Sequence, residues 1–342
     1  MRLSFPRAAL LALCFSAACS RDAANPPRAT SPVAPSIADL AVQASCQTIV
    51  DNTGTLLLKQ DLAGFDNFCL RFVGGSGELN CQDHDVQGID VTDVHGLTIR
   101  NCRMRAFSST RSSDVTLVGN VLTADPRRTV ATVVRFAEGG NNRVVSNSID
   151  GGWRGQPYPP GGYPPGADDG IIIENDASLT IEGNVIRNVW DCGIERLGNR
   201  TDPITIRNND IANAGECGIG SWFAAGWRDS VIVDNTVSNS GPFAEIYFSP
   251  NQNKGVVGIT FRNNVFENNT FRNPSNRSAP SVNIDYVSAT VRMPVDIGNN
   301  IFRNNDFGSD IPAPRLTPAG GFVDGGENIC RQDVKSALSC VR

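Results

Sequence analysis

Histidine and lysine are scarce in this sequence of 342 residues. It contains 2 histidines, and only Lys59, Lys254 and Lys335 among its 30 basic residues are lysines. So few histidines exclude a histidine-rich metal centre. The net charge is −5 and there is no basic run, so we expect neither a nucleic acid nor a nucleotide as a partner. Hydrophobic residues make up 40 % of the chain, which excludes a disordered protein.

Long apolar runs are also missing, apart from a short one at the N-terminus. Residues 1–18 have the order of an export signal, with Arg2 and Arg7 followed by the apolar stretch Ala8–Phe15 and a small-residue end. The apolar stretch is too short to stay in a bilayer as a span. We therefore expect an exported protein of the cell envelope.

Cys19 follows the small pair Ala17 and Ala18, and this junction resembles the lipidated cysteine of bacterial lipoproteins. Ser16 departs from that pattern, which has an aliphatic residue there. The resemblance implies a lipid anchor, and Ser20 after the cysteine favours the outer membrane. Ordinary cleavage, giving a periplasmic or secreted protein, is the alternative.

The chain after the signal divides into a tether, one folded domain and a cap. Residues 19–44 include a stretch rich in Pro, Ser and Ala, which is typical of an extended and semi-rigid linker. Residues 45–326 carry the repeat described next, and residues 327–342 form the expected C-terminal cap.

A repeated pattern predicts the fold. An alternating apolar strand is followed by a small or polar residue, then by Asn, then by an apolar residue two places on. Its separations run from about 18 residues, counted from Cys102, which stands in the Asn position of an earlier copy, to about 37 residues, which is the length of one coil of a β-solenoid. The asparagines of the repeat are Asn120, Asn147, Asn184, Asn209, Asn235, Asn264 and Asn300. Stacking places the same position of successive coils about 4.8 Å apart, so we expect these amides to form a structural ladder rather than a binding site.

With these residues the chain resembles the right-handed parallel β-helix of the pectin-lyase-like superfamily. The first coils are similar to the β-helix repeats of carbohydrate-binding proteins and sugar hydrolases. We therefore expect an all-β, single-domain solenoid of about nine coils. The resemblance is specific for the fold and weak for the function, because this fold supports lyases, hydrolases, epimerases and adhesins.

The cysteines fit such a coil. Cys14 leaves with the signal, and eight others remain besides Cys19. Cys192 and Cys217 occupy the same position in two successive coils, and two more pairs are about one coil apart, so each pair can form a disulfide. The last pair would form a disulfide within the C-terminal cap. The predicted bridges are Cys46–Cys69, Cys81–Cys102, Cys192–Cys217 and Cys330–Cys340. The sequence has no CxxC spacing, which argues against zinc.

Acidic residues recur beside a second strand that begins with Gly-Ile. Asp168, Asp191 and Glu216 each stand three residues before the Ile, in three successive coils. The position after the Ile holds Glu195, and corresponding positions further on hold Tyr247 and Asp285; Asp169 occupies the position filled elsewhere by Cys192 and Cys217. Carboxylates stacked this closely would share a proton or hold a cation. The alternative is that Asp168, Asp191 and Glu216 are solvated turn residues without a function. The candidate catalytic residues are Asp168, Asp169, Asp191, Glu195 and Glu216, and Asp168, Asp191 and Glu216 could bind Ca²⁺.

Aromatic residues gather in the same coils. All four tryptophans lie between residues 153 and 227, and the longest insertion, residues 151–170, adds two tyrosines. Rings with polar edges suit the apolar face of a sugar and its hydroxyl groups. The alternative is that some of the rings cover the interior. The candidate substrate-binding residues are Trp153, Tyr158, Tyr163, Trp190, Arg196, Trp222, Trp227 and Tyr247.

Two functions remain open from the sequence. The first is an enzyme that binds and cleaves or remodels a polysaccharide, as a lyase or a glycoside hydrolase. A lyase would need an arginine or lysine base, for which Arg196, Arg200 and Arg228 are candidates. The second is a surface β-helix that binds a glycan or a protein without catalysis. The similarity to polygalacturonases is partial, since Cys217 stands where that family has a histidine, so their mechanism is not carried over.

Overall fold

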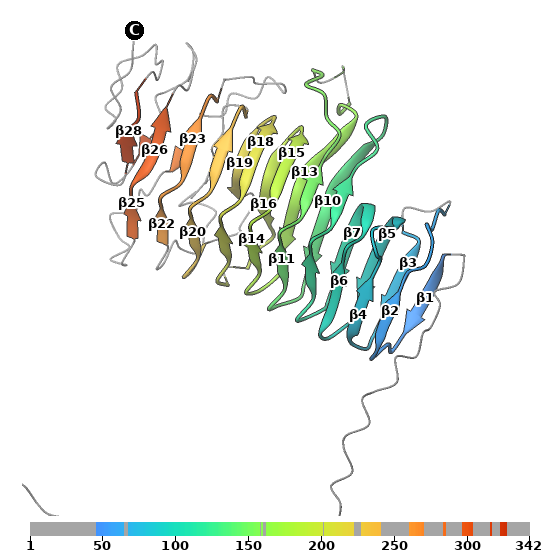
Figure 1. Ribbon diagram of the computed structural model, residues 1–342. Helices are drawn as coiled ribbons and strands as arrows, with labels where there is room; N and C mark the ends of the chain where they lie inside the picture. The colour runs from blue at the N-terminus through green and yellow to red at the C-terminus, as the bar shows by residue number, and fades with distance from the viewer. Residues whose placement is uncertain are drawn as a thin grey trace, which may run out of the picture. The chain divides into compact units, whose positions relative to one another are not determined.

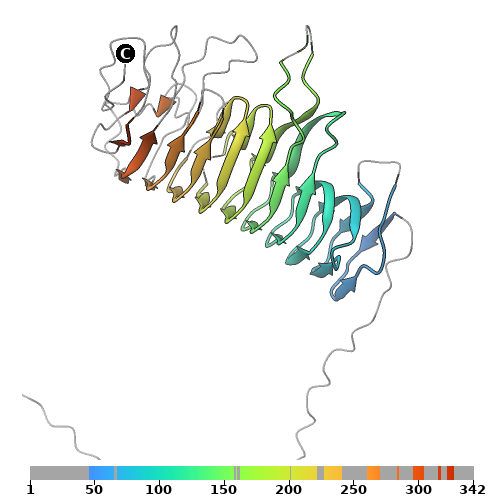
Figure 2. The same cartoon turned by 45° about the horizontal axis from the view of Figure 1, so that its top comes forward.

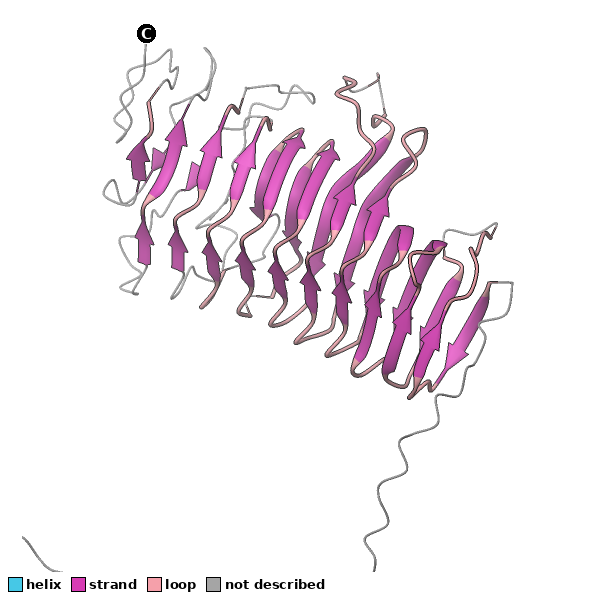
Figure 3. Ribbon diagram, viewed as in Figure 1, coloured by secondary structure: helices cyan, strands magenta, loops and turns pink. Residues whose placement is uncertain are grey.

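The computed structural model describes residues 46–64, 68–157, 159, 162–200, 202–221, 227–240, 260–269, 283–284, 296–303, 315–316 and 322–326. In this part of the chain all regular structure is β-strand, and no helix has the length and hydropathy of a membrane span (Figure 3). The predicted lipidation site Cys19, the predicted tether, Cys330 and Cys340 lie outside the described residues. Tyr158, Trp222, Tyr247 and Asp285 lie outside them as well.

The strands form parallel sheets that wind as a solenoid, and successive coils stack along its axis (Figures 1 and 2). One sheet has ten strands, one from each of ten coils. The repeat in the sequence predicted about nine coils. Its strands are β2 (Thr55–Leu57), β4 (Gly77–Asn80), β6 (Leu97–Arg100), β8 (Thr116–Val118), β11 (Arg143–Val145), β14 (Thr180–Glu182), β17 (Thr205–Arg207), β20 (Val231–Val233), β22 (Thr260–Arg262) and β25 (Asp296–Gly298).

A sixteen-stranded sheet forms the rest of the coil in two runs that meet at β7. The first run contains β1 (Gln47–Val50), β3 (Leu70–Val73), β5 (Asp85–Thr92), β7 (Arg103–Thr110), β10 (Thr129–Ala137), β13 (Gly166–Glu174), β16 (Cys192–Leu197) and β19 (Cys217–Ser221). The second contains β9 (Val121–Thr123), β12 (Ser148–Asp150), β15 (Val185–Val189), β18 (Asp210–Ala214), β21 (Thr236–Ser238), β23 (Val265–Glu267), β26 (Asn300–Arg303) and β28 (Phe322–Asp324). A separate pair is made by β24 (Asn283–Ile284) and β27 (Arg315–Leu316).

The core is built from columns of aliphatic and aromatic side chains. In-register pairing stacks one inward residue of each coil on the next, and every member of such a column is buried. Burial of a continuous column explains why short strands are stable here although none could be stable alone. One column consists of Leu117, Val144, Ile181, Ile206, Ile232 and Phe261.

The repeated asparagines form the predicted ladder. All seven are buried at the corner between two sheets, each in a different coil, and the side-chain amide Nδ2 of Asn184 donates to Asn209 Oδ1 at 3.0 Å. Asn209 donates in the same way to Asn235 Oδ1, and also to the carbonyl of Ile181. The residue before each asparagine is in the left-handed region, as at Gly183 (φ 65°) and Asn208 (φ 55°). This backbone conformation explains why the repeat has a small or polar residue there.

Three of the four predicted disulfides are confirmed. Cys46–Cys69, Cys81–Cys102 and Cys192–Cys217 each join neighbouring coils. The Cys192 and Cys217 residues are direct partners in the β16–β19 register. Stacking alone therefore brings the members of each pair within disulfide reach.

Asp176 is an acid in a position that favours a neutral side chain. It is buried, it accepts a hydrogen bond from Asn142 Nδ2 at 2.9 Å, and its Oδ1 has no hydrogen-bond partner among the described residues. Burial raises the pKa of Asp176 to about 6. A folded-state pKa above the ordinary value means that this group favours folding at low pH, and that the contribution is lost as the pH rises through 6.

We expect Asp176→Asn to stabilise the protein by about 1–2 kcal/mol at pH 8 and to have little effect at pH 4, because the amide is neutral at both. Thermal and urea unfolding at the two pH values measure this difference. Asp83→Asn, in an exposed turn, is the matched control and should leave the pH dependence unchanged. A destabilised Asp176→Asn protein at pH 8 would contradict the assignment.

Candidate functional site

The predicted acidic column lies on three neighbouring strands, β13, β16 and β19. Their register aligns Ile171 with Ile194 and Ile194 with Ile219. The residues three places before each isoleucine are therefore stacked: the Asp191 N–H donates to the carbonyl of Asp168 and the Glu216 N–H donates to that of Asp191, both at 2.9 Å. Sequence and structure agree on this column.

The glycine of each Gly-Ile pair places Asp169 on the same side as the column. A β carbon on Gly170 would lie 2.6 Å from Cγ2 of the core residue Ile186, so both Gly170 and Ile171 face the interior. Gly193 and Gly218 meet Ile211 and Val237 in the same way. In a regular strand, alternation would place Asp169 on the same face as Ile171. Because Gly170 and Ile171 both face inward, this alternation is interrupted and Asp169 faces away from the core.

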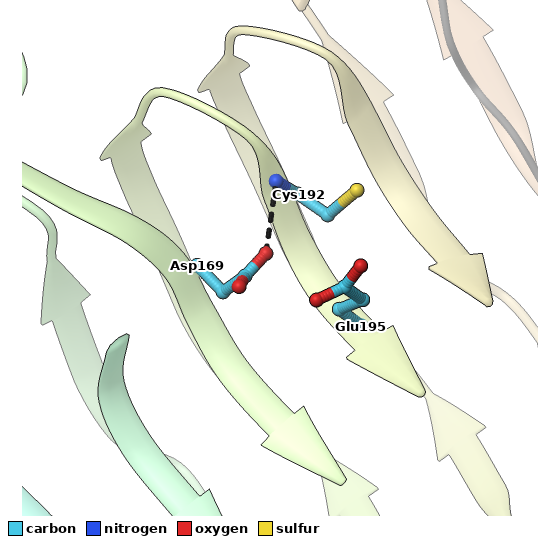
Figure 4. A group of neighbouring side chains, drawn as sticks. All are labelled: Asp169, Cys192 and Glu195. Atoms are coloured by element: carbon cyan, nitrogen blue, oxygen red, sulfur yellow. Dashed lines mark hydrogen bonds between the residues drawn. The ribbon is translucent and has the colours of Figure 1, made fainter. Parts of the chain in front are cut away.

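Carboxylates from two coils converge at this corner. Oxygens of Asp168, Asp169 and Asp191 all lie within 4.8 Å of one another. Glu195 also approaches Asp169, and Asp169 Oδ1 accepts a hydrogen bond of 3.1 Å from the Cys192 N–H (Figure 4). We call Asp168, Asp169, Asp191, Glu195 and Glu216 the acid cluster.

The members of the acid cluster differ in burial. Asp168 and Asp191 are half-buried residues, although the Oδ1 atom of Asp168 is itself buried. Asp169, Glu195 and Glu216 are buried, with only 1 %, 6 % and 5 % of their surfaces exposed. Buried carboxylates beside partly solvated ones are the arrangement that separates acids from bases in an active site.

Burial and mutual repulsion change the ionisation of the inner pair. Burial, with the negative charges of Glu195, Asp191 and Asp168, raises the pKa of Asp169 well above its ordinary value. Burial also raises the pKa of Glu195 to about 7, against the opposing effect of its hydrogen bond with Asp169. Asp169 and Glu195 therefore share a proton near neutral pH.

Cys192 is not a metal ligand, although its sulfur lies beside Asp169 and Glu195. It is bonded to Cys217, and a disulfide sulfur has no thiolate to coordinate a metal. Asp168, Asp169 and Asp191 are the oxygen ligands that remain. Two members of the predicted calcium set, Asp168 and Asp191, are therefore joined here by Asp169, and calcium binding by Asp168, Asp191 and Glu216 stays a prediction.

The three tryptophans that the structure describes do not form the expected sugar-binding surface. Trp153, Trp190 and Trp227 are all buried, with at most 4 % of their surfaces exposed. Trp190 stacks under Tyr163 with ring centroids 5.0 Å apart, and Tyr163 itself is exposed. Of the predicted aromatic residues that the structure describes, Tyr163 alone presents a ring to solvent, because the others fill spaces between or behind coils.

Arg196 is also placed away from solvent. Its guanidinium lies 5.5 Å from the centroid of Trp227, whose Nε1 donates to Ser221 Oγ, and its Nη2 donates to the carbonyl of Asp202. Burial lowers the pKa of Arg196 to about 10, so it remains a cation at neutral pH. Arg200 pairs with Asp202 in the adjacent turn. The predicted roles of Arg196 in substrate binding and of both arginines as lyase bases do not fit these positions.

The sheet topology, the asparagine ladder and the buried columns define a parallel β-helix. The model of the family described as "Right handed beta helix region" matches residues 72–241 and 169–313, and the chain belongs to this family. No curated protein matches the chain.

Solved structures of the same fold differ widely from this chain in sequence. PfbA, a surface adhesin of Streptococcus pneumoniae, is 12 % identical, with 78 % of this chain and 79 % of that chain covered and a TM-score of 0.37. The Dettilon tailspike protein is 15 % identical, with 85 % and 59 % covered and a TM-score of 0.34. Pectate lyase Pel9A is 14 % identical, with 84 % and 72 % covered and a TM-score of 0.28. Likeness at this level concerns the fold alone.

Proposed function

We propose that the acid cluster is the active site of a glycan-cleaving enzyme of the glycoside hydrolase type. The observation that carries the proposal is that the buried Asp169 lies within 4.8 Å of two other carboxylates, those of the buried Glu195 and of the half-buried Asp191. Glycosidic cleavage needs one carboxylic acid that still holds its proton and one carboxylate that is ionised. This corner of the coil supplies both.

The chemistry follows from those two states. Glu195, in contact with Asp169, gives its proton to the oxygen of the leaving sugar as the glycosidic bond breaks. Asp191 acts on the other side of the bond, either by attacking the anomeric carbon or by accepting a proton from the attacking water. Asp168 adds negative charge that supports the positive charge developing on the sugar ring.

A hydrolase fits the described residues better than a lyase. A β-elimination needs a base such as arginine beside the substrate, and Arg196 and Arg200 are both held in other contacts. Of the three candidate bases, the exposed Arg228 is the one that these contacts leave open. A purely adhesive surface is also less well supported, since three of the four tryptophans are buried.

The test is a panel of neutral and uronate-containing polysaccharides incubated with the full chain. Release of new reducing ends without absorbance from an unsaturated product is the expected result. Unsaturated product would replace the hydrolase with a lyase. Binding without turnover on any polysaccharide would favour the non-catalytic alternative.

The envelope location is part of the proposal. The signal-like residues 1–18 and Cys19 support an exported, lipid-anchored protein, and the disulfides fit an oxidising compartment. Metabolic labelling with a fatty-acid analogue, compared between the natural chain and Cys19→Ala, tests the anchor.

Calcium would compete with the proton for these carboxylates. Ca²⁺ binds oxygen at about 2.4 Å, so oxygens within 4.8 Å of one another can share one ion. We expect millimolar calcium to raise the melting temperature more at pH 8 than at pH 4, because protons compete with the ion for these carboxylates as the pH falls. Asp168→Asn should reduce this effect, and magnesium chloride at equal ionic strength is the control. No change in melting temperature at either pH would rule out the cation.

A further inference from the structure

A hollow lies on the N-terminal coils, and none of the residues of the acid cluster lines it. It has a volume of about 730 Å³ and is lined by residues from 61–63, 85–87, 103–105 and 121–127. We call it the N-terminal groove. Its volume is within the range of about 300–1,000 Å³ that is typical of sites for small ligands.

The groove runs along the solenoid axis. Leu62 bridges to Val86, Val86 pairs with Met104, and Met104 pairs with Leu122, so four successive coils contribute one segment each. Coils are spaced by about 4.8 Å, which gives the groove a length of about 14 Å. The loop of residues 124–127 forms its C-terminal wall. An extended ligand of a few units, lying across the strands, fits this shape.

The charges of the lining cancel. It contains three carboxylates and three guanidinium groups, and no other charged side chain. Arg103 pairs with Asp85 at 3.2 Å, and Arg127 pairs with Asp125 at 3.0 Å. Arg105 also approaches Asp125, with 4.0 Å between Arg105 Nη1 and Asp125 Oδ2. A lining with no net charge does not favour a strongly charged ligand of either sign.

The same residues offer many directed hydrogen bonds above an aliphatic floor. Carboxylates accept, guanidinium groups donate, and Gln87 and Thr123 do both. Between them lie apolar side chains from each coil, including Leu62, Met104, Val121 and Pro126. Neutral sugars combine these two properties, since each ring has several hydroxyl groups and an apolar C–H face.

We propose that the N-terminal groove binds a neutral oligosaccharide of about three or four sugar units. This site is non-catalytic and does not depend on the activity of the acid cluster. Arg105 and Asp125 bind sugar hydroxyls at one end, and Asp61 does so at the other. Such a groove would hold one part of a glycan on the N-terminal coils, while another part of the same glycan reaches the rest of the solenoid.

The test is isothermal titration of the full chain with neutral oligosaccharides of two to six units, made of glucose, mannose, galactose or N-acetylglucosamine. Ala63→Trp fills the groove from an exposed position, and Arg105→Ala removes hydrogen-bond donors. We expect each to weaken binding by about tenfold. Arg111→Ala, at an exposed arginine that pairs with Asp93 outside the groove, is the matched control and should bind normally.

The results separate this proposal from the active site. Binding that survives Glu195→Gln but is lost in Ala63→Trp supports the groove, whatever the outcome for cleavage. The proposal is overturned if no neutral oligosaccharide binds, if only uronate oligosaccharides bind, or if binding is lost in Glu195→Gln and is unchanged in both groove variants.

Discussion

Replacing Glu195 by Gln or Asp191 by Asn is expected to lower the rate of glycan cleavage by about 10²–10⁴-fold, the usual contribution of a positioned acid or base. An amide at the first position could not take part in the proton that Glu195 shares with Asp169, and an amide at the second would lack the negative charge of Asp191. Both changes keep the size of the side chain. The measurement is the initial rate of reducing-end release on whichever polysaccharide the natural chain cleaves.

The pH profile adds a second readout that a structural defect would not reproduce. Because the pKa of Glu195 is about 7, activity in calcium-free buffer should fall as the pH rises through 7 and the proton is lost. Asp234→Asn, at an exposed turn on another face of the coil, is the matched control and should leave rate and profile unchanged. Unchanged turnover in both Glu195→Gln and Asp191→Asn would place the active site elsewhere.

The asparagine ladder should give the largest stability effect. We expect Asn209→Ala to destabilise the protein by about 3–5 kcal/mol. Asn209 Oδ1 accepts from the Asn184 N–H and side chain, while its own Nδ2 donates to Asn235 and to the Ile181 carbonyl. Each buried partner left without a hydrogen bond costs about 1–3 kcal/mol, and the missing side chain leaves a small cavity.

Chemical unfolding of the full chain measures this loss. Asn199→Ala is the matched control, because Asn199 is exposed in a turn, and it should change stability by less than about 0.5 kcal/mol. A loss of less than about 1 kcal/mol in Asn209→Ala would show that neighbouring coils or water replace the ladder amide.

Much of the fold can be read from the sequence because a solenoid repeats its local rules. A left-handed turn residue, an Asn and an inward apolar residue recur in each coil, so their spacing predicts the strands, the ladder and the neighbours of each cysteine. The same spacing places Asp168, Asp191 and Glu216 in one column, and the structure confirms that stacking. The spacing does not predict the number of coils as closely as it predicts the strands, because insertions vary the coil length.

The burial of the aromatic residues could not be predicted from the sequence. A tryptophan beside an acid has the same pattern whether it faces a sugar or fills a gap between coils. Only the packed structure shows that Trp190 is covered by Tyr163, and that Trp227 is buried beneath Arg196. Long-range packing decides these positions, because the covering residues come from other coils or from insertions.

The scarcity of histidine and lysine implies that any catalytic group here is a carboxylate, an arginine or a bound cation. The sequence by itself also determined the β-helix and its acidic column. The tertiary structure decided which carboxylates meet. Gly170 and Ile171 both face the core, so the strand breaks its alternation and brings Asp169 against Glu195 and Asp191. It also assembled the N-terminal groove from four coils whose segments have no common motif. Both features depend on the three-dimensional path of the backbone, which periodicity alone does not specify.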